Sequence, residues 1–516
     1  MSESRTKKTI RNTIFSFGYK FSDVILAFVL RSVFIKTLSV SYLGLNGLFT
    51  NILTVLSLME LGVGSSIVFS LYKPLAENNY PKVAALMQLY KKTYNIIGIL
   101  VCGVGFALTP FLKYIINLPE SVDNIYLIYW LTIANTGVSY FLAYRRSLLM
   151  ADQRSDINNQ NLILFRFIRF AVLVLALLIF RNYILYLALD VSVTFVSNVH
   201  ITFVIKSKYK YLETVKPDPL TKDEKHNIVK YMTSGILSKV GQTVVTSTSN
   251  IIISAFISTV LVGVYSNYSM ITTNLDTLMY LTFNSMTASI GNFAVTNNSE
   301  ASEKLFKKIN MISYGLSFVI VVCLLSLISP FITIWVGSDY VLSNVTVIVL
   351  VLNFYLSINQ LSIGNFIGAV GELNYINRYR SLIEGVVNLV VSITLVKFTN
   401  LGITGVFIGT TVCFLCGRVW MDAHTLYKHW FKMPFRIYLK TYILRFLLCA
   451  VTTVVCKVIS DLIFTGLGIN VFTWLLVAFI CVAVSVGVIL AVFGKTEEFK
   501  YFVDLFSKIT KKILKK

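Results

Sequence analysis

The chain has 516 residues, of which 56% are hydrophobic and only 14% are charged, and its mean hydropathy is +0.73. A soluble domain carries roughly a quarter of charged residues, so this composition excludes a soluble enzyme or binding module and indicates a multi-span membrane protein. The formal net charge of +22 does not require a nucleic-acid partner, because basic residues collect in the cytoplasmic segments of membrane proteins.

The N-terminal segment, MSESRTKKTIRN, is polar and basic, and the apolar stretch after it carries Lys20, Asp23 and Arg31. No small-residue cleavage site follows, so we interpret this stretch as a retained first span and not as a signal peptide. Cys413 and Cys416 form a C-x-x-C inside another apolar stretch. Packing explains these small side chains better than a redox or metal site does, and we expect neither disulfides nor a metal.

Apolar stretches of about 20 residues, the length that crosses a bilayer as a helix, recur along the whole chain. Polar side chains within some of them leave a count of 12 or 13 spans open. We expect an all-α integral membrane protein with about 14 transmembrane helices, at 12–38, 44–72, 93–117, 123–147, 162–180, 183–206, 228–257, 262–287, 309–335, 341–368, 377–397, 402–424, 441–463 and 470–493.

The basic residues give these spans an orientation. When Lys20 is counted with the N-terminal tail, all but seven of the 46 Lys and Arg residues lie in the segments that a cytoplasmic N-terminus would place inside the cell, so both termini are expected to be cytoplasmic. The expected domains are an N-terminal six-helix lobe (1–206), a cytoplasmic linker (207–227), a second six-helix lobe (228–425), two extra transmembrane helices (426–494) and a tail (495–516). The tail is basic and amphipathic, which favours a helix on the anionic inner leaflet over a frayed end.

The two lobes resemble each other at a nearly constant offset. A shift of six spans preserves orientation, so the lobes are expected to be parallel repeats about an axis along the membrane normal, one of the two repeat symmetries of secondary transporters. The matches, at offsets of 216, 220, 219 and 219, are Tyr90 with Phe306, Pro110 with Pro330, Asp152 with Gly371 and Gly44 with Gly263.

Charged residues at membrane depth point to a polar interior, because lipid penalises them. Lys20 lies about 12 Å inside the first span at 1.5 Å per residue, and Glu60 reaches a similar depth from the other side. Lys239 occupies the repeat position of Lys20, and Asp276 corresponds to a residue one helical turn from Glu60. Each lobe therefore offers a lysine on its first span and a carboxylate on its second.

We interpret this pattern as a cationic central cavity in which Lys20, Arg31 and Lys239 bind an anionic group. Glu60, Asp23 and Asp276 are then cavity ion pairs or sites for a coupling ion, H⁺ or Na⁺. The alternative is that these residues are buried ion pairs that only fix helix register. Arg145 and Arg146, at the inner end of the fourth span, are candidates to collect a phosphate from the inner leaflet, with topology anchors as the plainer alternative.

Enzyme chemistry finds little support in the sequence. The chain has four histidines, and no H-E-x-x-H, nucleophile elbow, Walker loop or Rossmann glycine pattern. No stretch is long and polar enough to form a nucleotide-binding domain. We therefore expect a transport protein without a cofactor.

The stretch YLGLNGLF…ELGVGSSIVFSLYKPLAENN from Tyr42, followed by LYKK, resembles the second span of bacterial polysaccharide-transporter proteins, the Wzx-type O-antigen and capsule flippases of the MOP exporter superfamily. The resemblance covers nearly the whole chain and implies a V-shaped, two-lobed bundle in the bacterial cytoplasmic membrane. It implies that an undecaprenyl-pyrophosphate-linked oligosaccharide crosses from the inner to the outer leaflet. The family's cationic cavity corresponds here to Lys20, Arg31 and Lys239, whereas Asp276 has no firm counterpart.

Such a function implies a lipid-linked oligosaccharide substrate, contact with membrane lipids, and a polysaccharide polymerase and glycosyltransferases in the same pathway. The main alternative is a multidrug or other small-molecule exporter of the same superfamily, whose cation substrates would favour an acidic cavity. A membrane polymerase or glycosyltransferase would need larger outside loops with catalytic residues. A scaffold for glycan assembly would not need a duplicated bundle that carries charges. The sequence leaves the sugar composition and the coupling ion open.

Overall fold

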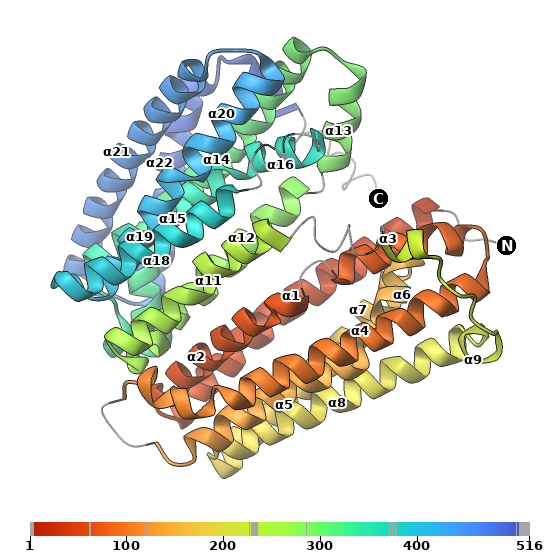
Figure 1. The fold of residues 1–516 in the computed structure, drawn as a ribbon. Helices are drawn as coiled ribbons and strands as arrows, with labels where there is room; N and C mark the ends of the chain where they lie inside the picture. The colour runs from red at the N-terminus through yellow and green to blue at the C-terminus, as the bar shows by residue number, and fades with distance from the viewer. Residues whose placement is uncertain are drawn as a thin grey trace. The chain divides into compact units, whose positions relative to one another are not determined.

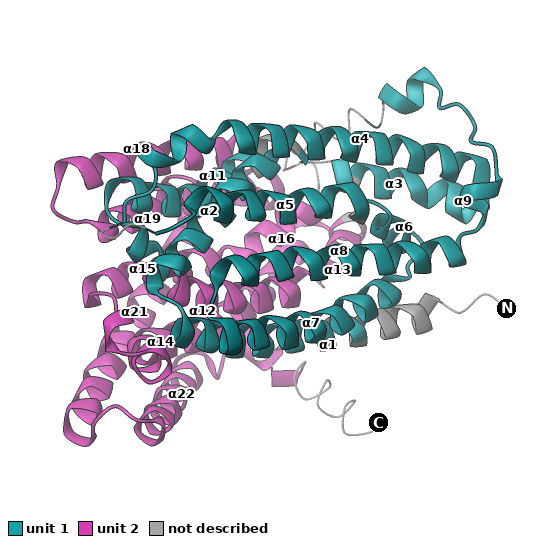
Figure 2. Cartoon of the chain, turned by 90° about the horizontal axis from the view of Figure 1, so that it is seen from below, with its two compact units in different colours: residues 1–263 teal, residues 264–516 magenta. Residues whose placement is uncertain are grey.

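The computed structural model describes residues 5–60, 63–118, 122–226, 228, 236–284, 286–370, 373, 376, 379–501 and 503–504. Every regular element in these residues is a helix, which confirms the predicted all-α class. The chain forms two compact units, Met1–Gly263 and Val264–Lys516 (Figure 2).

The helices of the first unit are mostly long, as the predicted spans require (Figure 1). They are α1 (Arg5–Thr37), α2 (Val40–Leu56), η1 (Ser57–Glu60), α3 (Val63–Ala76), α4 (Tyr80–Ala107), η2 (Thr109–Tyr114), α5 (Ile125–Ala143), α6 (Arg146–Ala151), α7 (Ser155–Phe180), α8 (Tyr183–Lys208), α9 (Tyr211–Thr214) and α11 (Ile236–Phe256).

The second unit repeats this pattern of long helices and short interruptions. After α12 (Thr259–Asn284), which begins in the first unit, come α13 (Thr287–Thr296), α14 (Ser299–Val336), η3 (Ser338–Tyr340), α15 (Asn344–Asn359), α16 (Leu361–Val370), α18 (Arg380–Phe398), α19 (Ile403–Cys416), η4 (Arg418–Asp422), α20 (Ala423–Thr425), η5 (Leu426–Phe431), α21 (Phe435–Leu467) and α22 (Val471–Phe493).

Side-chain caps set several helix starts. Asn79, Asn182, Asn298 and Asn470 each accept a hydrogen bond from a backbone N–H three residues on, and each precedes an apolar helix. Such caps satisfy donors that the first turn of a helix leaves without partners. The helix boundaries therefore follow local sequence chemistry as well as hydropathy.

Among the described residues, nine helices are long and apolar enough to cross a membrane, and α2 is a shorter apolar helix. The chain is thus a multi-pass membrane protein, while the count of 14 spans stays a prediction. Some predicted spans are interrupted. The span expected at 44–72 comprises α2, η1 and α3, and the one expected at 341–368 comprises α15 and α16.

The predicted lobes and linker also stay predictions. The boundary between the two compact units lies at residue 263. The reason is local packing. Helix α11 and the start of α12 pack against α2, so the contacts place them with the first unit.

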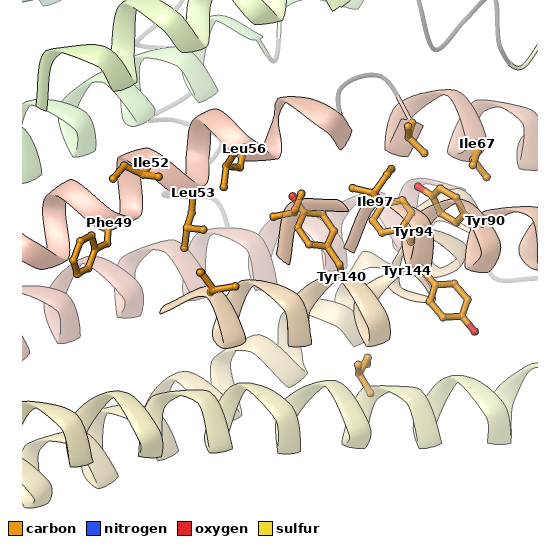
Figure 3. Packing of buried hydrophobic residues seen from close by; sticks show 14 of the residues in the cluster. Phe49, Ile52, Leu53, Leu56, Ile67, Tyr90, Tyr94, Ile97, Tyr140 and Tyr144 are labelled. Atoms are coloured by element: carbon orange, nitrogen blue, oxygen red, sulfur yellow. The ribbon is translucent and has the colours of Figure 1, made fainter. Parts of the chain in front are cut away.

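The first unit has a core of large apolar side chains between α2, α4 and α5 (Figure 3). Phe49 packs on Tyr129 with ring centroids 5.0 Å apart, and Tyr90 packs edge-on against Tyr94 at 4.9 Å. Some polar groups in this core have partners, as when the Tyr129 hydroxyl donates to the Gly105 carbonyl at 3.0 Å. The same core cluster includes Phe34 of α1, Leu177 of α7 and Leu187 of α8, three helices that also carry charged residues.

Candidate functional site

A group of charged side chains lies inside the first unit, where α1 packs along α7. Lys20 and Asp23 are one turn apart on α1, with Lys20 Nζ 3.6 Å from Asp23 Oδ2. Arg166 of α7 makes the closer contact, with Nη2 2.8 Å from Asp23 Oδ1. Asp23 therefore holds two cations, and Lys20 pairs with Asp23 and not with Glu60.

A second ion pair lies next to the first. Arg169, one turn after Arg166 on α7, donates through Nη2 to Asp190 Oδ2 at 2.7 Å, and its Nε also contacts this carboxylate. Asn135 of α5 donates to the same oxygen at 3.0 Å. Asp190 is only 4% exposed, so this carboxylate is buried within the helix bundle by these contacts.

Arg146 differs from the other arginines because its partners are neutral. Its guanidinium donates to Asn158 Oδ1 at 2.7 Å, to Asn198 Oδ1 at 3.0 Å and to Ser197 Oγ at 3.4 Å. No carboxylate among the described residues forms an ion pair with it. Its neighbour Arg145 instead donates to the Tyr144 hydroxyl at 3.0 Å, so the two predicted phosphate-collecting residues have different surroundings.

Arg146, Arg166 and Arg169 line one cavity of about 270 Å³. Its lining consists of Tyr19, Ser139, Arg146, Leu162, Phe165, Arg166, Arg169, Val193, Thr194, Ser197 and Asn198. Lys20 and the three arginines face only two carboxylates in these contacts, Asp23 and Asp190. The described part of the site therefore has an excess of two positive charges. Guanidinium groups bind phosphate oxygens in pairs, which makes this cavity suited to a phosphorylated anion.

Neither Lys20 nor Arg31, two of the three predicted cationic residues, lines this cavity. Arg31 lies further along α1, within electrostatic range of the hydroxyl groups of Tyr183 and Tyr186. The side chain of Lys239 lies outside the described residues. Lys20 therefore links the predicted site to the observed cavity, through its contact with Asp23.

Glu60 ends the short helix η1, at the interruption between α2 and α3. It accepts a short hydrogen bond from the Tyr94 hydroxyl of α4, and Tyr140 of α5 also interacts with it. The carboxylate is thus held by tyrosine hydroxyls in the core of the first unit. This explains how the second span carries an acid without a lysine partner.

The second unit has a cluster of buried charges around Glu384, and the charges of this cluster cancel. Glu384, fully buried on α18, contacts Arg380 Nη1 and Arg418 Nε, each at 3.3 Å. Arg380 Nε also lies 3.2 Å from Asp422 Oδ1. Asp276 is near enough to Arg418 to interact with its charge but forms no ion pair among the described residues. This cluster therefore offers no excess of positive charge to an anion.

The sequence pattern missed Arg166, Arg169 and Asp190. Arg166 and Arg169 were assigned to membrane topology because they lie near the inner end of a predicted span. Their spacing of three residues places both on one face of α7, toward Asp23 and Asp190. That spacing within an apolar helix, together with the intramembrane Asp190, was the available signal.

A bundle of apolar helices with charges inside it defines a polytopic membrane transporter. A family model described as "Polysaccharide biosynthesis protein" matches residues 9–290, more than half of the chain. The chain belongs to this polysaccharide biosynthesis family, which confirms the resemblance in the second span. The family consists of transporters and flippases and not of enzymes.

Solved structures show the same fold. The lipid II flippase MurJ in an inward closed conformation is 14% identical, with a TM-score of 0.65 over 96% of this chain and 100% of that chain. An inward-facing multidrug resistance MATE transporter of the MOP superfamily is 14% identical, with a TM-score of 0.61 over 78% and 94%. The Vibrio cholerae MATE transporter VcmN is 13% identical, with a TM-score of 0.56 over 86% and 99%. No curated protein sequence matches the chain.

Proposed function

We propose that the protein is a flippase that moves an undecaprenyl-pyrophosphate-linked oligosaccharide from the inner to the outer leaflet of the bacterial cytoplasmic membrane, for capsule, O-antigen or exopolysaccharide biosynthesis. The family membership and a fold shared with a lipid II flippase support a lipid-linked substrate. The observation that carries the proposal is the arginine-lined cavity, with its excess of two positive charges.

The cavity suits the pyrophosphate, the part of such a substrate whose transfer across the membrane has the largest energetic penalty. A pyrophosphate cannot enter hydrocarbon unaided, because an unpaired ion loses its hydration there. Arg146 offers a guanidinium that neutral amides orient and that no described carboxylate neutralises, beside Arg166 and Arg169. A cavity of about 270 Å³ can hold a pyrophosphate but not an oligosaccharide as well. The charged link is therefore the part recognised here, and the sugars and lipid occupy other space.

Asp23 and Asp190 have a role in this proposal. In the structure they hold Arg166 and Arg169 in place. An entering pyrophosphate would compete with them for the same N–H donors, and its departure would restore the ion pairs. The arginines are thus never left without a counter-charge, which limits the energetic penalty of the empty state.

The remaining predictions form part of the proposal. Lys20, Arg31 and Lys239 contribute positive charge along the substrate path, both termini are cytoplasmic, and alternating access moves the site between the leaflets. A polymerase and glycosyltransferases of the same pathway supply and consume the substrate. Coupling to H⁺ or Na⁺ would use Glu60, Asp23 or Asp276. Transport that persists after the ion gradients are collapsed would refute this coupling.

A multidrug exporter is the second candidate, favoured by the likeness to MATE transporters in fold. A cationic drug would meet an excess of positive charge in the observed cavity, which argues against it. The deciding experiment reconstitutes the full chain in liposomes and follows a fluorescent polyprenyl-pyrophosphate oligosaccharide and a cationic dye. The proposal predicts movement of the oligosaccharide lipid and no export of the dye. The reverse result would establish the exporter.

Arg146→Gln makes this experiment specific to the site. The substitution keeps hydrogen-bonding capacity and removes the charge, so the variant should fold and lose most of the transport. Arg181→Gln is the matched control, because Arg181 is an exposed arginine in the same unit, at the end of α7. Equal transport by both variants would remove the cavity from the proposed mechanism.

A further inference from the structure

A second cavity lies within the second unit, between α14, α15 and α21. It measures about 160 Å³, and tyrosine rings dominate its lining. Tyr438 and Tyr442 stack on α21 with centroids 5.7 Å apart, and Tyr355 of α15 lies 6.4 Å from Tyr442. Helix α21 is one of the two helices predicted to lie outside the internal repeat. The proposed flipping mechanism uses no residue of this cavity.

Arg445 of α21 lies at the wall of this cavity and forms no ion pair with the described residues, although Glu498 is near enough to interact with its charge. Its Nη1 donates to Asn310 Oδ1 at 2.5 Å, and its guanidinium lies 5.1 Å from the Tyr314 ring and 5.8 Å from the Phe493 ring. Among the described residues, no carboxylate comes within ion-pair distance of it. Its Nε is buried without a hydrogen bond. Neutral and aromatic groups therefore hold the Arg445 guanidinium in place, and its Nε–H group is still available to donate a hydrogen bond.

Phenol groups in the same lining are also left without hydrogen bonds. The hydroxyl oxygens of Tyr355, Tyr438 and Tyr442 are buried and have no well-formed partner in the described part of the chain, although Gln360 lies close to the latter two. A buried polar group left without a hydrogen bond destabilises the folded protein. Such groups around one cavity indicate that a polar ligand completes the site.

An apolar groove adjoins this polar cavity. It measures about 430 Å³ and is lined by Met311, Thr441, Leu444, Arg445, Leu448, Val492, Phe493, Thr496 and Glu498. It shares Thr441, Arg445 and Glu498 with the tyrosine-lined cavity. Leu444 is 58% exposed and Val492 is 52% exposed, so the groove opens on the outer surface of the apolar helices α21 and α22. The two cavities together form one amphipathic site with Arg445 at the junction.

The order of residues along α21 leads us to expect Arg445 near the lipid headgroups. It is about 15 Å from the start of α21 at 1.5 Å per residue, after Arg436 and Lys440 and before the long apolar part of the helix. Phe493, its aromatic neighbour, is the last residue of α22. Lysines at this end, such as Lys307 and Lys495, favour an anionic membrane surface.

We propose that this site binds one anionic phospholipid, with its phosphodiester at Arg445 and the tyrosine hydroxyls and one acyl chain in the adjoining groove. A phosphodiester has one negative charge, which matches the single unpaired guanidinium. Lys307 already pairs with Glu303 at 2.7 Å and adds little. Glu498 lines both cavities, so it disfavours a pyrophosphate, which would bring more negative charge beside it. This charge balance separates the site from the arginine-lined cavity of the first unit.

The test uses the purified full chain, stripped of lipid in detergent and titrated with phosphatidylglycerol while native mass spectrometry counts bound molecules. One phosphatidylglycerol per chain should bind more tightly than zwitterionic phosphatidylethanolamine. Arg445→Gln should weaken phosphatidylglycerol binding about tenfold, which corresponds to the loss of about 1.4 kcal/mol. Arg436→Gln is the control, because Arg436 is exposed on the same helix and lines neither cavity.

A second variant keeps the proposal testable if Arg445→Gln does not fold. Leu444→Trp fills the groove from an exposed position, and it should weaken binding of phosphatidylglycerol without disturbing the core. Three results would overturn the proposal. These are equal binding of phosphatidylglycerol by the Arg445→Gln and Arg436→Gln proteins, equal affinity for the two phospholipids, and tighter binding of a polyprenyl pyrophosphate that depends on Arg445. The last result would make this a substrate site.

Discussion

Gly44 and Gly263 contact each other's helices reciprocally. A Cβ on Gly44 would meet the carbonyl group of Thr259, four residues before Gly263, and a Cβ on Gly263 would lie 2.8 Å from the carbonyl oxygen of Val40, four residues before Gly44. Gly44 and Gly263 are 219 residues apart, and so are Val40 and Thr259, which is the offset of two of the four sequence matches. Such a contact is what a two-fold repeat produces when equivalent helices cross at their starts.

This contact predicts a sharp response to the smallest side chain. Gly44→Ala places a methyl group against backbone that cannot rotate away, so the folded protein should lose about 1–3 kcal/mol, the usual cost of overpacking. The melting temperature in detergent measures this loss. Gly263→Ala should behave in the same way, since its neighbours are also backbone atoms of the opposite helix.

Gly103→Ala is the control for both variants. Gly103 lies in α4 of the same unit and has nothing within 4 Å of an added Cβ. Alanine should therefore leave stability unchanged or raise it by about 0.5–1 kcal/mol, because it favours the helix. If Gly44→Ala and Gly103→Ala have the same melting temperature, the close crossing of α2 and α12 is not present in the folded protein.

The sequence predicts those site residues whose charge interrupts an apolar stretch. Lys20 and Asp23 interrupt an apolar run, so their depth alone marked them, and the structure shows them in contact. Arg166 and Arg169 lie near a predicted boundary, where a basic residue has an ordinary explanation in topology. Only the packing of α7 against α1 and α8 reveals that Arg166 reaches Asp23 and that Arg169 reaches Asp190.

For the fold, too, the sequence predicts the features that follow a local pattern and misses those that depend on contacts between distant residues. Hydropathy predicts the long helices, because a bilayer needs a continuous apolar stretch. It does not predict the interruption at η1, where Glu60 finds Tyr94 and Tyr140 as partners from two other helices. Those partners are 34 and 80 residues away along the chain, so no local pattern could supply them.

The buried Arg169–Asp190 pair leads to a second prediction. Asp190→Asn removes the carboxylate and leaves Arg169 without its ion-pair partner in the bundle, which should cost about 3–5 kcal/mol of folding free energy. The melting temperature should fall well below that of the parent protein. Asp461→Asn is the control, because the Lys457–Asp461 pair on α21 has Asp461 55% exposed and should contribute about 0–1 kcal/mol. Comparable losses in the two variants would show that Asp190 is not buried as described.

Glu60 gives a prediction that separates an ion-coupling role from a structural one. Glu60→Gln can still accept the hydrogen bond from Tyr94 but cannot gain or lose a proton, so the variant should fold normally. If Glu60 binds the coupling ion, its transport should no longer respond to an imposed gradient of H⁺ or Na⁺. Tyr94→Phe removes the hydroxyl and keeps the acid, so it should lower stability but preserve the response. If transport by the Glu60→Gln protein depends on the ion gradient as strongly as transport by the wild type does, Glu60 has only a structural role.

The last prediction concerns the contact between the predicted linker and α4. Lys82 Nζ lies 2.5 Å from Glu224 Oε2, and the Thr221 backbone N–H donates to the same oxygen at 2.8 Å. The hydrogen bond from Lys82 lowers the pKa of Glu224 below its ordinary value. A depressed pKa means that the contact is fully present at neutral pH and is lost as the pH falls through the folded-state value.

Proteolysis of this segment should therefore increase as the pH is lowered below about 4.5, the ordinary pKa range of a glutamate. An acid-tolerant protease and a short digestion at each pH measure the exposure of residues near Glu224. Glu224→Gln keeps the hydrogen-bond acceptor and loses the charge, so its cleavage should be faster at neutral pH and independent of pH in this range. A Glu224→Gln protein that keeps the parent's pH dependence would assign the effect to another carboxylate.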